Sequence, residues 1–189
     1  ADLNRAVQLS PDDVDAYFAR GTVHQERAEA EKAIADYDQA VRFSPDFAEA
    51  HLNRARALWE TGEIDRAIAD CSRAIELGLE HADAYYYRGD AYVKKGDVDR
   101  AITDLDRAIG LSPRLADAYF SRATAHWSKG NPRQTVADCS EALRLGLRSA
   151  GIFSYRGAAY YALGSFDLAL RDLNDAVRIE PWRVDAYYY

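Results

Sequence analysis

Small residues and prolines recur along this chain at a constant spacing of 34 residues, with no insertion or deletion. Two series of small residues are Ala33, Ala67, Ala101, Thr135 and Ala169, and Ala6, Ala40, Ala74, Ala108, Ala142 and Ala176. A third series is Pro11, Pro45, Pro113 and Pro181, with Leu79 and Leu147 in its two gaps. A period of this length is typical of a solenoid, in which one supersecondary unit stacks on copies of itself. The question of function therefore becomes which face of the repeats binds a partner.

One period, residues 82–115, has the pattern of two helices. The spacing predicts a first helix from Ala82 to Lys95, which ends at Gly96, because glycine readily adopts the backbone of a helix end. Asp97 is the expected N-cap of a second helix, and Pro113 lies just beyond that helix. The residues with helical spacing are Tyr85, Gly89 and Tyr92 in the first helix, and Ala101, Leu105 and Ala108 in the second. Each period therefore predicts a helical hairpin, whose helices we call helix A and helix B.

This arrangement closely resembles the tetratricopeptide repeat (TPR) family. The shared features are a large residue at the fourth position, Gly or Ala at the eighth, Ala at the twentieth and twenty-seventh, and Pro at the thirty-second. The resemblance implies an all-α fold, a single TPR α-solenoid in which antiparallel helix pairs form a right-handed superhelix. The expected repeats are 14–47, 48–81, 82–115, 116–149 and 150–183, preceded by a half repeat (helix B) at 1–13 and followed by the start of another at 184–189.

Two departures from the family pattern affect the expected packing. Thr135 replaces the small alanine between the helices of the fourth repeat. Ala28 stands where the other repeats have a turn glycine, so the first repeat is expected to turn less sharply. The cysteines, Cys71 and Cys139, occupy the same repeat position and are expected to be small buried residues. None of these departures argues against the repeat fold.

Every complete repeat has an arginine on helix A and an aspartate on helix B, where a ladder of ion pairs is expected. The arginines are Arg20, Arg54, Arg88, Arg122 and Arg156, and the aspartates are Asp36, Asp70, Asp104, Asp138 and Asp172. A partly buried guanidinium needs a carboxylate partner. The sequence leaves open whether Arg54 pairs with Asp70 or with Asp36. Because the pattern recurs in every repeat, a structural role is favoured over ligand binding.

The resemblance also implies that helix A lines a groove in which ligands bind. Carried over by position, the candidate partner-binding residues are Phe18, Leu52, Arg56, Trp59, Tyr86, Asp90, Phe120, Trp127, Tyr161 and Tyr188. The groove predicted from them is aromatic and mostly acidic, and it suits a protein or extended peptide with basic or apolar side chains. The alternative, that several rings only pack against the neighbouring repeat, stays open. The basic clamp of TPR proteins that grip a terminal carboxylate is missing from the corresponding positions.

Composition and motifs argue against several other functions. The net charge of −7 disfavours nucleic acid, which binds a basic surface. No segment has the apolar length of a membrane span, and the first residues lack a signal-peptide pattern. The four histidines are not clustered in the sequence, so they predict neither a metal site nor a catalytic triad. We expect no enzymatic activity, metal or cofactor.

The second hypothesis is structural. The second and fourth repeats share features that the others lack, such as Trp59 and Trp127, so a pair of repeats is the apparent unit of duplication. The chain starts within a helix B and stops within a helix A, without polar capping faces, as expected for a window cut from a longer array. Uncapped ends favour end-to-end self-association into a superhelical filament. A third hypothesis is the recognition arm of a larger enzyme.

The sequence does not indicate a compartment. The lack of a targeting segment favours the cytoplasm slightly, whereas a filament would be compatible with the cell envelope or the exterior. The Arg- and Ala-rich repeats are typical of bacterial proteins in composition alone.

Overall fold

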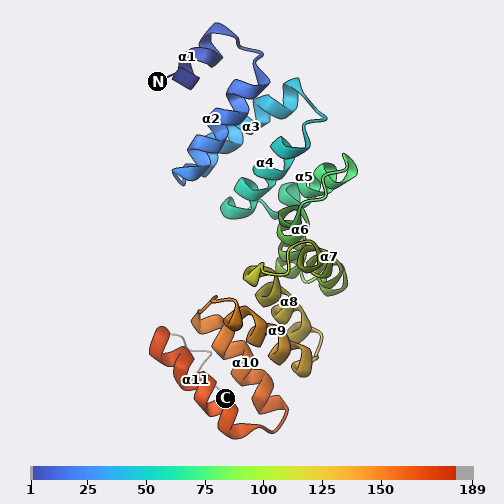
Figure 1. Ribbon diagram of the computed structural model, residues 1–189, viewed down its shortest axis with the longest axis vertical. Helices are drawn as coiled ribbons and strands as arrows, with labels where there is room; N and C mark the ends of the chain where they lie inside the picture. Colours follow the sequence, from blue (N-terminus) through green and yellow to red (C-terminus); the bar gives the residue numbers. More distant parts are fainter. Residues whose placement is uncertain (1, 182–189) are drawn as a thin grey trace. The chain divides into compact units, whose positions relative to one another are not determined.

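The computed structural model describes residues 2–181, with side chains from Leu3 onward (Figure 1). Within these residues it contains eleven α-helices and no strand, which confirms the predicted all-α fold. The helices are α1 (Asp2–Leu9), α2 (Val14–Glu26), α3 (Ala30–Phe43), α4 (Ala48–Thr61), α5 (Ile64–Glu76), α6 (Ala82–Lys95), α7 (Val98–Leu111), α8 (Ala116–Ser128), α9 (Pro132–Arg144), α10 (Ala150–Ala162) and α11 (Phe166–Ile179). The bounds of α6 are those expected from the sequence, and Asp97 caps α7 by accepting a hydrogen bond from the backbone N–H of Arg100.

The chain forms two compact units, Ala1–Ala91 and Tyr92–Tyr189, and the boundary between them falls within α6. In the first unit α2 packs on α3, α4 packs on α5, and α3 also contacts α4. In the second unit α8 packs on α9, α10 packs on α11, and α9 also contacts α10. Within each unit a helix B thus contacts its own helix A and the next one, as stacked repeats require. The single solenoid and its repeat boundaries stay predictions.

The small residues of the period form the contact between helices. The residues at the twentieth position (Ala33, Ala67, Ala101, Thr135 and Ala169) and the twenty-seventh (Ala40, Ala74, Ala108, Ala142 and Ala176) are at most 2% exposed. Side chains of this size let helix axes approach closely, and larger neighbours such as Leu58 and Leu105 fill the space beside them. The hydroxyl of Thr135 is accommodated because it donates to backbone carbonyl oxygens of Asn131 and Ala123.

A second contact joins the eighth residue of each repeat, on helix A, to the twenty-fourth residue, on helix B. A Cβ added to Gly21 would lie 2.8 Å from Cε1 of Tyr37, and one added to Gly157 would lie 2.9 Å from Cγ of Leu173. The second and fourth repeats instead combine an alanine with a cysteine, as Ala55 with Cys71 and Ala123 with Cys139. Both cysteines are fully buried thiols that take part in no disulfide, as the sequence predicts. In alternate repeats, a larger residue on helix A is thus compensated by a smaller residue on helix B.

The turn between helices A and B is the same in all five repeats, so the expectation of a blunter turn at Ala28 is wrong. The N–H of Glu29 donates to the carbonyl oxygen of His24 at 2.9 Å. The same contact joins Glu63 to Leu58, Asp97 to Tyr92, Asn131 to His126 and Ser165 to Tyr160. This hydrogen bond closes a turn of six residues, and it places the residue just before the donor in the left-handed backbone region. Ala28 therefore adopts φ 56°, and among the described residues it alone does so without being glycine.

Candidate functional site

Helices α2, α4 and α6 of the first unit line two adjoining hollows. The first, of about 220 Å³, is lined by Phe18, Glu49, Leu52, Asn53, Arg56, Leu79, His81, Asp83 and Tyr87. The second, of about 210 Å³, is lined by Thr22, Gln25, Glu26, Asn53 and Arg56. Because Asn53 and Arg56 border both, the two hollows are continuous, and we call them together the groove. Its walls are apolar and polar side chains of consecutive helices A, which is the face that the sequence indicates for binding.

The groove has more carboxylates than cations. Glu26, Glu49 and Asp83 border it, and Arg56 is the cation among its lining residues. Nε of Arg56 donates to Oε1 of Glu60 at 3.0 Å, so part of this positive charge is already balanced. Burial alone would lower the pKa of Arg56, but Glu60 and nearby groups hold that pKa above its ordinary value. The groove is thus electrostatically suited to a positively charged or neutral ligand.

Trp59 and Asp90, both predicted from the sequence, contact each other across two repeats. Nε1 of the Trp59 indole donates to Oδ2 of Asp90 at 2.9 Å. The Trp59 ring lies 5.6 Å from the ring of Tyr87, which in turn lies 5.0 Å from Tyr86. These four residues join α4 to α6 beside the groove and hold the Tyr87 ring that lines it. Trp59 therefore contributes to the packing of the second repeat on the third.

Phe18 and Leu52 are both in the groove wall and anchored in the core. Leu52 is only 8% exposed and packs with Ala74 and Ala84. The ring of Phe18 lies 4.7 Å from that of Phe47, and both side chains are partly buried. Each of these side chains exposes only a small part of its surface to the groove. They therefore shape the groove wall.

The remaining predicted residues lie in the second unit or beyond the described part of the chain. Phe120 packs edge-on against Tyr155 with ring centroids 5.9 Å apart. Trp127 is half-buried on α8. Tyr161 is 47% exposed and lies 5.5 Å from Phe166. Tyr188 falls outside the described residues. The predicted residues are thus divided between the two units, and their role in binding stays a prediction.

The arginines and aspartates form two-point ion pairs within repeats. In each pair Nε and Nη2 of the arginine donate to the two carboxylate oxygens, at 2.6–2.9 Å. The pairs are Arg20 with Asp36, Arg54 with Asp70, Arg122 with Asp138, and Arg156 with Asp172. Arg54 therefore pairs with Asp70 of its own repeat. Arg88 lies in the first unit and the buried Asp104 in the second.

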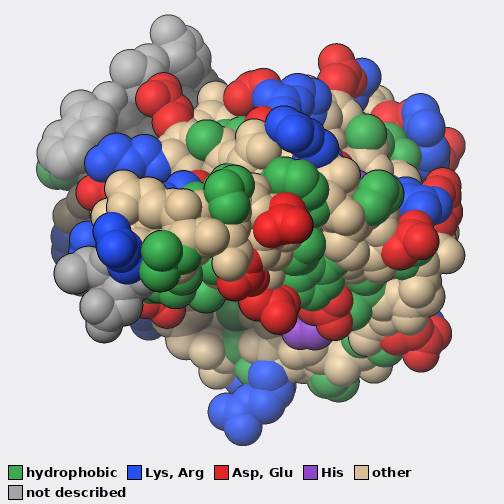
Figure 2. Space-filling model, turned by 90° about the horizontal axis from the view of Figure 1, so that it is seen from above, with side chains coloured by type: hydrophobic (Ala, Val, Ile, Leu, Met, Phe, Trp, Pro, Cys, Tyr) green, Lys and Arg blue, Asp and Glu red, His purple; other side chains and the backbone are tan. Residues whose placement is uncertain are grey.

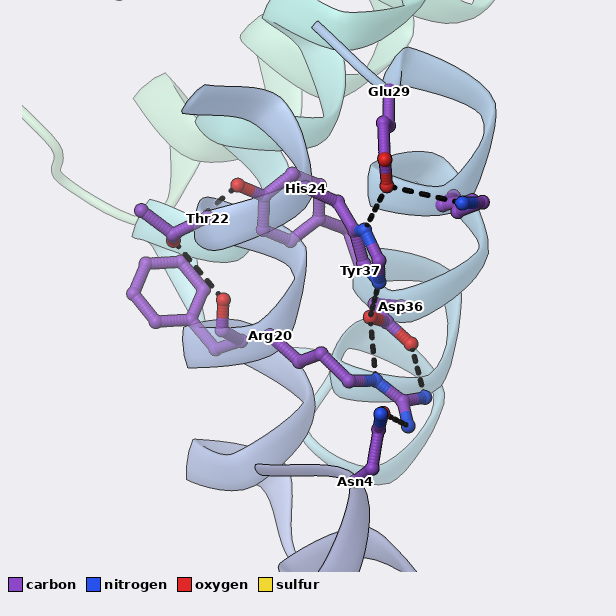
Figure 3. A network of polar contacts seen from close by, with 9 residues as sticks. Asn4, Arg20, Thr22, His24, Glu29, Asp36 and Tyr37 are labelled. Atoms are coloured by element: carbon purple, nitrogen blue, oxygen red, sulfur yellow. Dashed lines mark hydrogen bonds and ion pairs between the residues drawn. The ribbon is translucent and has the colours of Figure 1, made fainter. Parts of the chain in front are cut away.

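The third nitrogen of each guanidinium bonds to the preceding helix B, a contact that the sequence analysis missed. Nη1 of Arg54 donates to Asp38 at 2.8 Å, and Nη1 of Arg156 donates to Ser140 at 3.2 Å. The full set of acceptors is Asn4, Asp38, Ser72, Asp106 and Ser140. Figure 3 shows Arg20 between Asp36 and Asn4. Each arginine thus connects its repeat to the previous one. In the sequence, the polar acceptors recur every 34 residues, and this spacing could have predicted the contact.

Histidine extends the network in the first, second and fourth repeats, and in the fourth Nε2 of His126 lies 3.9 Å from Oδ2 of Asp138. His24 Nδ1 lies 2.6 Å from Oε2 of Glu29 (Figure 3), and His51 Nδ1 lies 3.1 Å from Oδ1 of Asp70. Burial alone would raise the pKa of Asp70, but hydrogen bonds from Arg54 and His51 outweigh it and lower that pKa. Asp70 is therefore a carboxylate at neutral pH, held by two side chains of α4.

Metal-binding clusters and membrane-spanning helices are both absent from the described residues. Within residues 2–181, no group of His, Cys, Asp and Glu side chains has the arrangement of a metal site. None of the helices described there is long and apolar enough to cross a membrane. Acidic, basic and apolar side chains are interspersed on the face seen in Figure 2.

Comparison with known proteins agrees with this geometry. The family model described as "Tetratricopeptide repeat" matches residues 1–46, 18–78, 52–116 and 120–182. Among curated proteins, no sequence matches the chain.

Several solved structures share the fold. YrrB, described as a TPR protein with an unusual peptide-binding site, is 21% identical with a TM-score of 0.80, over 99% of this chain and 96% of that one. PilW, described as a type IV pilus biogenesis factor, is 18% identical with a TM-score of 0.79, over 98% and 86%. MamA from Desulfovibrio magneticus RS-1 is 17% identical with a TM-score of 0.76, over 90% and 97%. At these identities the likeness concerns the fold.

Proposed function

Because the chain belongs to the tetratricopeptide repeat family, we propose that it is a non-catalytic scaffold that binds a partner protein or extended peptide in the groove between α2, α4 and α6. The observation that carries this proposal is the groove itself, two continuous hollows lined by the same face of successive helices. A groove of this kind can follow a peptide along several residues, which a single pocket cannot. The peptide-binding site named for the structurally similar YrrB supports the same class of function.

The chemistry of the groove favours a partner segment with basic and apolar side chains. Glu49 has no hydrogen-bond or ion-pair partner within the described residues, and its carboxylate is exposed at the groove edge. Apolar side chains would contact Leu52, Leu79 and Phe18, and cations would approach Glu49 and Asp83. Complementary charge speeds the encounter, and apolar contacts supply most of the affinity. In the second unit, we propose that Phe120, Trp127 and Tyr161 make partner contacts of their own.

A charge reversal in the groove tests the proposal. Peptides selected from a displayed random library on the protein would be synthesised and titrated by calorimetry against the wild type and Glu49→Arg. Glu49→Arg is expected to weaken binding at least about tenfold, or about 1.4 kcal/mol. The control is Glu31→Arg, since Glu31 is the second residue of α3 as Glu49 is the second of α4, but lies outside the groove. Equal affinity of all three proteins would reject the groove as the site.

Self-association is the second candidate function. The observation that favours it is a set of large apolar side chains exposed on α11, among them Phe166 at 63% and Leu170 at 62%. Stacking of copies end to end would produce a superhelical filament. Electron micrographs of negatively stained protein over a range of concentrations separate the two candidates: filaments that lengthen with concentration support stacking, and discrete particles support the scaffold.

A further inference from the structure

The second hollow of the groove is lined by polar side chains alone. Thr22, Gln25 and Glu26 come from α2, and Asn53 and Arg56 come from α4. The hollow has a volume of about 210 Å³. Polar side chains that converge on one space fix the orientation of a ligand and provide specificity. This hollow is therefore the part of the groove that can select a ligand by its hydrogen bonds.

The side-chain amide of Gln25 is held at this hollow through only one of its two polar atoms. Oε1 accepts a hydrogen bond from the Tyr37 hydroxyl at 2.9 Å. Tyr37 is fully buried, and its hydroxyl also lies 3.4 Å from Oγ1 of Thr22 (Figure 3). Nε2 of Gln25 is buried and makes no hydrogen bond within the described residues. Because a buried donor without an acceptor is destabilising, Nε2 indicates a missing hydrogen-bond partner.

The next pair of repeats shows how the chain satisfies a donor at the same position. Trp59 stands one period after Gln25, and Asp90 stands one period after Arg56. There the Trp59 indole packs against Tyr87 of α6, and its Nε1 donates to Oδ2 of Asp90 at 2.9 Å. Between α2 and α4 the position of this acceptor is held by Arg56, and a guanidinium cannot accept a hydrogen bond. The acceptor for Gln25 therefore has to come from a bound molecule.

The charges around the hollow indicate an uncharged ligand group. Nε of Arg56 donates to Glu60, and its two terminal nitrogens make no hydrogen bond within the described part of the chain. Glu26 also lines the hollow and is exposed. A cation would be repelled by Arg56 and an anion by Glu26, whereas a neutral group that both donates and accepts can use both. Among neutral side-chain groups, a carboxamide has two N–H donors and an oxygen that accepts twice.

We propose that the second hollow is a subsite for the side-chain carboxamide of an asparagine or glutamine in the partner segment. The carboxamide oxygen accepts from Nε2 of Gln25 and from a terminal nitrogen of Arg56, and the carboxamide NH2 group donates to Glu26. Tyr37 is a positioning residue, because its hydroxyl holds the Gln25 amide in place. Nε2 lies beneath the surface of the hollow, so binding requires exposed side chains at the rim to change rotamer, as is common at interfaces.

This inference rests on the proposed function of the groove and adds one residue type that the partner presents beside its basic and apolar ones. Peptides selected from a displayed random library on the wild type and on Gln25→Met test it. The wild-type selections are expected to share an asparagine or glutamine at one position. On Gln25→Met this preference is expected to disappear, while basic and apolar residues stay enriched elsewhere. Gln39→Met is the matched control, since it makes the same change on α3, outside the groove.

Calorimetry measures the preference on single peptides. Replacing the shared asparagine by leucine, or glutamine by methionine, keeps the size of the side chain and removes its amide. This replacement is expected to raise the dissociation constant on the wild type at least about tenfold and to have little effect on Gln25→Met. The aspartate or glutamate version is also expected to bind the wild type more weakly, because Glu26 repels an anion. Tyr37→Phe is expected to show an intermediate preference, and circular dichroism on heating checks that each variant is folded.

Each outcome separates the subsite from the groove. A carboxamide preference that Gln25→Met leaves unchanged would overturn the proposal, as would wild-type selections without a shared asparagine or glutamine. Tighter binding of the aspartate or glutamate version would assign the hollow to a carboxylate instead. If Glu49→Arg weakens the selected peptides but Gln25→Met changes no preference, the groove binds peptides and only the subsite is wrong. If Glu49→Arg has no effect, the groove is rejected as the site, and the subsite with it.

Discussion

Arg156 on α10 and Asp172 on α11 form a two-point ion pair, with Nε and Nη2 donating to the two carboxylate oxygens at 2.7 and 2.8 Å. Asp172 is 3% exposed, so its charge is removed from water and depends on this arginine. The remaining acceptor of Arg156 is the hydroxyl of Ser140, which is neutral. In the preceding repeat, Arg122 has two carboxylate partners, Asp138 and Asp106. This difference between the repeats has a measurable consequence.

Asp172→Ala is expected to destabilise the protein by about 3 kcal/mol, because it leaves Arg156 partly buried without any carboxylate. Asp138→Ala is the comparison, and its cost is expected to be smaller, because Asp106 still pairs with Arg122. Urea unfolding followed by circular dichroism measures both. In the double variant Arg156→Met with Asp172→Leu, most of the loss is expected to be regained. Equal costs for the two aspartates would mean that the second acceptor contributes nothing.

His126 gives the protein an acid-sensitive position. Burial lowers its pKa and outweighs the opposing charge of Asp138, and its Nδ1 is buried without a hydrogen-bond partner. A histidine whose pKa is lower when folded binds protons more readily when unfolded. Its contribution to stability is therefore complete above the unfolded pKa of about 6.5 and is lost as the pH falls below it.

His126→Tyr introduces the residue that the fifth repeat has at this position, Tyr160. Between pH 7.5 and 5.5, the thermal midpoint is expected to fall less for this variant than for the wild type. Scanning calorimetry at both pH values measures the difference. An identical fall in both proteins would show that other groups carry the pH dependence.

Ala28→Gly is expected to stabilise the protein by about 1 kcal/mol, because Ala28 has φ 56°, where a Cβ is unfavourable and glycine is not. The control is Ala35→Gly, in the interior of α3 and exposed, which is expected to cost about 1 kcal/mol. Both are measured by thermal unfolding. If Ala28→Gly destabilised as much as Ala35→Gly, the turn would not be strained in solution.

Gly157→Ala is expected to destabilise by about 1–2 kcal/mol, because the added Cβ would meet Cγ of Leu173 at 2.9 Å and the gain in helix propensity does not offset this overlap. Adding Leu173→Cys recreates the Ala–Cys combination of the second and fourth repeats and is expected to recover part of the loss. Gly110→Ala is the control, since a Cβ there meets nothing within 4 Å, and it is expected to stabilise. Denaturant unfolding compares the four proteins, and a neutral Gly157→Ala would contradict the volume match.

The sequence predicted the helices and the buried alanines well because both depend on local, repeated patterns. The bounds of α6, the cap at Asp97 and the burial of Ala101 and Ala108 all follow from spacing within one period. Ala28 was misjudged for the opposite reason. Its backbone is set by the hydrogen bond from Glu29 to His24, which closes the turn irrespective of the residue inside it. A residue's own preference is a weak guide where a cooperative contact outweighs it.

The candidate site was less predictable. Family position alone identified Trp59 and Asp90, but not that they bond to each other. It also treated Leu52 as available, although the side chain is almost entirely buried. Exposure depends on which neighbours pack around a side chain, and those neighbours come from other repeats. The groove is therefore defined by lining residues such as Asn53 and Glu49, which composition does not distinguish.

By itself, the sequence determined the period, the helical hairpin and the family, because each requires only residue types at regular spacing. Tertiary structure alone decided which acceptors each arginine contacts, how Gly157 accommodates Leu173, and that Phe166 and Leu170 of α11 are exposed. Those properties depend on distances between side chains of different helices. A repeating sequence offers several equivalent partners, and packing selects among them by volume and charge.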